Sequence, residues 1–147
     1  MILAKPRPSG QDKQSVAFHD MKNEHYLLRQ TQAVRNACAH STNIVNGFSL
    51  REPSSIRTPK EVAIALGEIG INKRAKRSKM ANPRIQQITM VAYAYHGLVT
   101  GIHSREMCRE LVDSLKKRIN LHADWYEGVD SVHSSFDFLN TVFVNWI

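Results

Sequence analysis

Apolar residues recur at intervals of three and four along much of this chain, between short segments rich in proline, glycine and serine, and such spacing predicts helices. The clearest case begins at Thr58, which can cap a helix, with Pro59 at the first helical position and Glu61 completing a capping box. The apolar residues that follow at helical spacing are Val62, Ala65, Leu66 and Ile69. Gly70 then ends the pattern, so the sequence predicts a short helix here.

Two longer segments have weaker helical patterns. Residues 12 to 40 contain no proline or glycine and carry apolar residues at roughly helical intervals, which predicts one long helix or two in tandem. Asn82 and Pro83 predict the start of another helix, which should end near Gly97 or Gly101.

The last third of the chain predicts two more helices. Ser104 can cap the first, which should reach about Tyr126. Its apolar stripe, beside a charged face, consists of Cys108, Leu111, Val112, Leu115 and Ile119. Residues 136 to 146 are rich in valine and phenylalanine, which also suits a strand, but their length favours a helix. We therefore predict an all-α bundle of about five helices, with Trp125 and Trp146 as packing residues.

The length of 147 residues is usual for one domain. Pro6, Pro8 and Gly10 indicate that residues 1–10 form a flexible lead, followed by a single helical domain over residues 11–147. The two cysteines, Cys38 and Cys108, offer no disulfide framework, and no stretch approaches the roughly 18 apolar residues of a membrane span. We therefore expect a cytoplasmic protein without a membrane partner.

Basic residues outnumber acidic ones by 20 to 13, and the formal charge of +7 favours a polyanionic partner such as nucleic acid. Five basic residues occur within positions 73–79, and one more follows nearby. The candidates for RNA binding are Lys73, Arg74, Lys76, Arg77, Lys79 and Arg84. The run is equally typical of a solvated linker between helices, and both interpretations stay open.

The segment Arg35-Asn36-Ala37-Cys38-Ala39-His40 contains residue types that suit cleavage of RNA. Histidine transfers protons near neutral pH, arginine offers a fixed bidentate cation to a phosphate, and asparagine can orient either group. Asn36 and His40 are four residues apart and share a helix face, whereas Arg35 lies about 140° away from His40 around the helix. The alternative is that Arg35 and His40 only complement the dipole at a helix C-terminus.

The same segment, with Asn46 six residues beyond the histidine, resembles the Arg-Asn-x-Cys-Ala-His-x5-Asn signature of the Abi-like (abortive infection) family of the HEPN superfamily. The resemblance implies a helical bundle that forms a homodimer, in which motifs from two chains face each other in a metal-independent ribonuclease centre without a cofactor. It also implies a role in phage defence, or as the toxin of a toxin-antitoxin pair with an antitoxin protein as partner.

By this resemblance Arg35 would contact the scissile phosphate, Asn36 would hold the geometry, His40 would be the acid/base and Asn46 would be structural. The remaining histidines lack the spacing of metal ligands, so we expect no metal site. Two other hypotheses remain. One is a non-catalytic regulator that binds nucleic acid or protein, like mannitol-repressor-like proteins with a similar Arg-Asn-x-x-Ala-His segment. The other is a purely structural interaction module.

Overall fold

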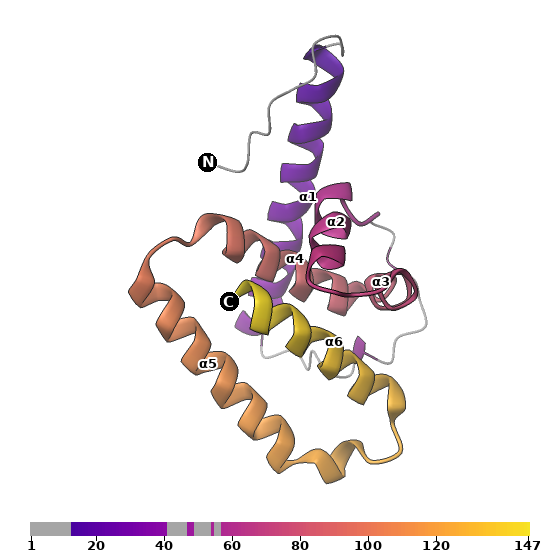
Figure 1. Cartoon of the computed structure of the whole chain (residues 1–147), viewed down its shortest axis with the longest axis vertical. Helices are drawn as coiled ribbons and strands as arrows, with labels where there is room; N and C mark the ends of the chain where they lie inside the picture. The colour runs from indigo at the N-terminus through magenta and orange to yellow at the C-terminus, as the bar shows by residue number, and fades with distance from the viewer. Residues whose placement is uncertain (1–12, 41–46, 49–53, 55–56) are drawn as a thin grey trace.

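Helices make up every regular element in the described part of the chain, which confirms the predicted all-α bundle (Figure 1). A computed structural model describes residues 13–40, 47–48, 54 and 57–147, with side chains from Glu24 onward. In chain order the elements are α1 (Lys13–Ala39), α2 (Lys60–Glu68), α3 (Lys73–Met80), α4 (Pro83–Leu98), α5 (Ile102–Leu121), the 3-10 helix η2 (Ala123–Tyr126) and α6 (Asp130–Trp146). The lead predicted for residues 1–10 lies outside the described residues.

Helix α4 is the central element, because α1, α3 and α6 all pack against it. It starts where the sequence predicted: Asn82 is the N-cap, its Oδ1 accepts hydrogen bonds from the backbone N–H groups of Arg84 and Ile85, and Pro83 occupies the first position. The helix ends at Leu98, between the two glycines predicted to stop it.

The hydrophobic core lies between α4, α6 and the short helices α2 and α3. Leu66 of α2, Ile85 of α4 and Val142 of α6 are almost completely buried in it. The predicted helix over residues 136–146 is confirmed as part of α6, and Trp146 is buried there. Trp146 also meets Tyr93 edge-on, with ring centroids 5.5 Å apart, and the burial of Tyr93 raises the pKa of its hydroxyl.

The basic run is a helix, so its interpretation as a linker is wrong. Helix α3 spans Lys73–Met80, and the side chain of Asn72 caps it by accepting a hydrogen bond from the N–H of Ala75 at 2.8 Å. Its sequence contains only two apolar residues, Ala75 and Met80, so it has no apolar period that could reveal the helix, and only Met80 is buried. The residues nevertheless have good helix propensity, since lysine, arginine and alanine predominate.

Two helix starts differ from the prediction. Helix α2 begins at Lys60 after Pro59 and has no side-chain cap, because the Oγ1 of Thr58 accepts a hydrogen bond from Gln86 instead. Helix α5 begins at Ile102, two residues before the Ser104 that was predicted to cap it. Neither helix therefore has the side-chain cap that the sequence predicts.

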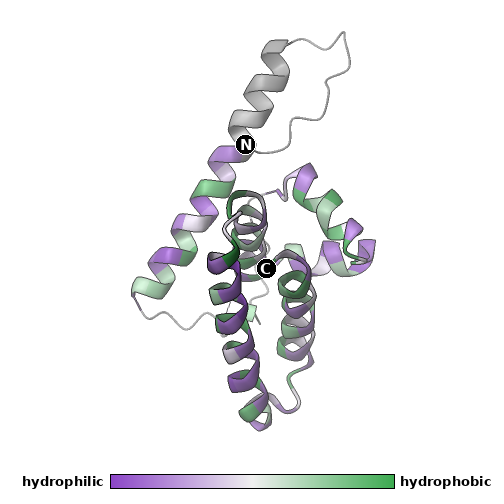
Figure 2. Ribbon diagram, turned by 60° about the vertical axis from the view of Figure 1, so that its left-hand side comes forward, coloured by the Kyte–Doolittle hydropathy of each residue, from purple (hydrophilic) through white to green (hydrophobic). Residues whose placement is uncertain are grey.

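Helix α5 borders the bundle, and none of its residues is buried (Figures 1 and 2). This differs from the usual case, in which an apolar stripe like the one predicted for this helix faces a core. The prediction that Trp125 is a packing residue is wrong, because it is 69% exposed and, among the described rings, stacks on that of His122 alone. None of the described helices combines the length and the apolar character that crossing a membrane requires.

Candidate functional site

The Arg35–His40 segment forms the last turns of α1. The backbone N–H of His40 donates to the carbonyl of Asn36 at 3.0 Å, so helical spacing is kept as far as the histidine. Ala37 is buried on the side that faces the bundle. Arg35, Asn36 and His40 are all exposed, so the three polar side chains of the motif stand on an open surface.

The side chain of Asn36 binds that of Arg35. Its Oδ1 accepts a hydrogen bond from Nη1 of Arg35 at 3.2 Å, and it lies one helical turn before His40 on the same face. The contact therefore draws the guanidinium group around the helix toward the face that carries the imidazole. The guanidinium of Arg35 is thus bound to a residue that shares a helix face with His40.

The chain after the motif is fixed to the start of α4. Asn46, the last residue of the signature, lies outside the described residues. The two residues that follow it are both buried, and Nδ2 of Asn82 donates to the carbonyls of Gly47 at 2.9 Å and Phe48 at 3.2 Å. A Cβ atom on Gly47 would clash with the side chain of Arg84, so a larger residue at this position would require Arg84 to move.

This anchoring was not anticipated from the sequence. Asn82 and Pro83 predict a helix start, but the second role of Asn82 depends on Gly47 and Phe48, which lie 35 and 34 positions away in sequence. The sequence does contain one signal for such a contact: when the side-chain oxygen of an N-cap asparagine accepts the capping hydrogen bonds, its amide nitrogen can still donate to another part of the chain.

The predicted RNA-binding residues divide into two groups. Three of them are engaged within the fold: Nζ of Lys76 donates to the carbonyl of Ala63, Nζ of Lys79 donates to hydroxyl groups of α6, and Nη1 of Arg84 donates to Gln87. Burial lowers the pKa of Lys79, and this effect outweighs the opposing charge of Asp137.

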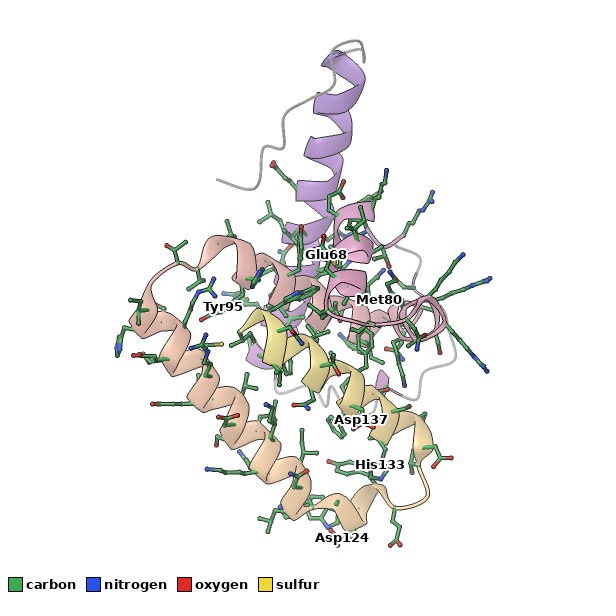
Figure 3. The ribbon with its side chains drawn as sticks, viewed as in Figure 1. Glu68, Met80, Tyr95, Asp124, His133 and Asp137 are labelled. Atoms are coloured by element: carbon green, nitrogen blue, oxygen red, sulfur yellow. The ribbon has the colours of Figure 1, made fainter. Side chains whose placement is uncertain are left out.

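The other three predicted RNA-binding residues, Lys73, Arg74 and Arg77, are exposed on α3. Several long side chains of α3 with nitrogen at their tips extend away from the bundle in Figure 3. The end of α1 and helix α3 lie on opposite sides of the molecule in Figure 2. Within one chain, the structure therefore does not bring the basic helix beside the Arg35–His40 segment.

Within the described residues, no group of three or more histidine, cysteine, aspartate or glutamate side chains is placed to hold a metal ion. Comparisons with models of protein families, with curated proteins and with solved structures found no match.

Proposed function

We propose that this protein is a metal-independent RNA endonuclease of HEPN type, which acts in the cytoplasm in phage defence or as the toxin of a toxin-antitoxin pair. The observation that carries the proposal is the exposed end of α1, where Arg35 donates a hydrogen bond to Asn36 and Asn36 shares a helix face with His40. The positive charge of the chain and its resemblance to the Abi-like signature support the same function.

The proposed reaction is attack of a ribose 2′-hydroxyl on the adjacent phosphorus. A bond forms between the 2′-oxygen and phosphorus, and the bond from phosphorus to the 5′-oxygen breaks. A base accepts the proton of the 2′-hydroxyl, an acid protonates the leaving 5′-oxygen, and Arg35 stabilises the charge that develops on the phosphate. The products are a 2′,3′-cyclic phosphate and a 5′-hydroxyl.

This chemistry explains why the proposed centre is formed by two chains. The step needs one group that accepts a proton and one that donates a proton, whereas a single motif contains one histidine. Two copies of the exposed α1 end, facing each other, would supply both imidazoles and two arginines. The exposure of His40 leaves it accessible to such a partner motif.

The experiment that tests the proposal is incubation of the purified protein with end-labelled RNA in the presence of EDTA, with His40→Ala protein prepared in parallel as a blank. We expect cleavage that survives EDTA and leaves cyclic phosphate ends, because no step needs a metal. A parent protein that cuts no RNA, or cuts as slowly as the blank, would contradict the proposed activity.

A second candidate function is supported by α3, whose exposed Lys73, Arg74 and Arg77 form a cationic face. A non-catalytic regulator would use this face to bind nucleic acid through its phosphates, with no cleavage. The logarithm of the binding constant falls with the logarithm of the salt concentration, and for single-stranded RNA each phosphate contact contributes about −0.7 to that slope. We expect that replacing all three residues with glutamine makes the slope less steep by about 2.

Filter binding at several salt concentrations measures this slope. The matched control replaces three exposed basic residues elsewhere with glutamine: Arg29, Arg57 and Lys60. A slope that changes equally in both triple variants would exclude α3 as the RNA-binding face and leave only the overall charge.

A further inference from the structure

Helix α5 and the adjoining η2 are joined to the bundle differently from the other long helices. No residue of α5 is buried, whereas α4 and α6 each bury several side chains. Within residues 102–126, all of which the structure describes, Tyr126 alone packs against the hydrophobic core. The helix forms an edge of the molecule in Figure 1. Packing of an apolar face provides most of the stability of a helix in a protein, and α5 lacks such packing.

Polar contacts attach the start of α5. Arg105 donates to two main-chain carbonyls at the end of α4, at 2.8 and 3.2 Å. One turn later, Nε of Arg109 donates to the main-chain oxygen of Ile147 at 2.9 Å. The hydroxyl group of Tyr95 adds a bond to the carbonyl of Ser104 (Figure 3). The two guanidinium groups thus cap the C-terminal ends of α4 and α6, where the helix dipole also favours a cation.

An aromatic contact attaches the other end. The ring of Tyr126 meets the ring of Phe136 edge-on, with centroids 5.6 Å apart, and Phe136 itself packs against the core. The neighbouring Trp125 stacks on His122 with centroids 4.0 Å apart, so this second contact lies wholly within residues 102–126. Gly128 follows with a φ of 78°, a conformation that glycine adopts readily, and the chain then enters α6.

A segment that is held at its two ends, with no buried side chain between them, can detach without disturbing the core. Release of one end leaves only the other to hold it, so opening at the two ends is coupled. We propose that residues 102–126 form a strap that opens as one unit, turning at Gly101 and Gly128, while α1, α4 and α6 stay folded. Opening removes both arginine caps and the contact of Tyr126 together. The strap is separate from the Arg35–His40 segment and does not depend on the proposed ribonuclease activity.

The first test is hydrogen–deuterium exchange of the full chain, followed amide by amide with NMR under conditions where exchange reports the opening equilibrium. After correction for intrinsic rates, we expect the amides of α5 to exchange at least about 100-fold faster than those in the middle of α4 and α6, because they need only the strap to open. Their protection should be nearly uniform along the helix. Amides of α5 that are as well protected as those of α4 would overturn the proposal.

The second test weakens each attachment in turn. Tyr126→Ala and Arg105→Ala should speed exchange along the whole of α5, about tenfold and about fivefold, because each change favours the open strap. The matched controls are Trp125→Ala, which removes a stack within the strap, and Arg118→Ala, which removes an exposed guanidinium of the same helix. Both controls should keep the rates of α5 within about twofold of the parent. If each attachment variant speeds only the amides beside the altered residue, the two ends open independently and the strap is not one unit.

Discussion

Replacing His40 with alanine is expected to lower the rate of RNA cleavage by a factor of about 100 to 10,000, the usual contribution of a positioned acid or base. His40 is exposed, so the substitution leaves the core intact and should not change the thermal unfolding midpoint. Arg35→Ala should cost about 100-fold or more, because it removes the cation that stabilises the phosphate. Single-turnover cleavage in EDTA measures both effects.

Matched variants separate these roles from general effects of charge. His103→Ala on α5 and Arg29→Ala on α1 change exposed residues of the same types outside the motif, and should retain the parental rate. Arg35→Lys keeps the charge but loses the planar pair of donors, so it should recover only part of the activity. Parental rates in His40→Ala and Arg35→Ala would mean that the motif only complements the end of α1, as the helix-dipole interpretation holds.

Local signals predicted much of the fold. Helix α4 was found because Asn82 and Pro83 fix its first turn through contacts with immediate neighbours. Helix α3 escaped detection because its residues face solvent on most sides and leave no apolar period, although Asn72 offered a cap. A capped run of good helix formers without proline or glycine is a signal that periodicity alone does not use.

Periodicity also does not identify what covers an apolar face. The stripe of α5 was visible in the sequence, but whether it meets the bundle or another chain depends on tertiary arrangement. The two tryptophans show the same limit, since Trp146 is buried and Trp125 is not. For the candidate site, helix geometry is enough to predict that Asn36 and His40 share a face. The hydrogen bond from Arg35 to Asn36 could not be predicted in this way, because it depends on the side-chain conformations of both residues.

Asn82→Ala is expected to reduce the free energy of unfolding by about 3 kcal/mol, the largest stability effect among exchanges of polar residues near the motif. Loss of the N-cap of α4 contributes about 1 kcal/mol. The rest arises because the buried carbonyls of Gly47 and Phe48 lose their donor, and each unsatisfied group costs about 1–3 kcal/mol. Denaturant unfolding followed by circular dichroism measures the difference.

The control is Asn72→Ala, which removes an exposed cap that accepts one hydrogen bond at the start of α3 and should cost only about 1 kcal/mol. Asn82→Asp separates the two functions of Asn82: a carboxylate still caps α4, but it cannot donate and places negative charge against two carbonyl oxygens. We therefore expect Asn82→Asp to be at least as unstable as Asn82→Ala. If aspartate instead restores the stability, the cap alone explains the role of Asn82, and the chain after the motif does not depend on its amide group.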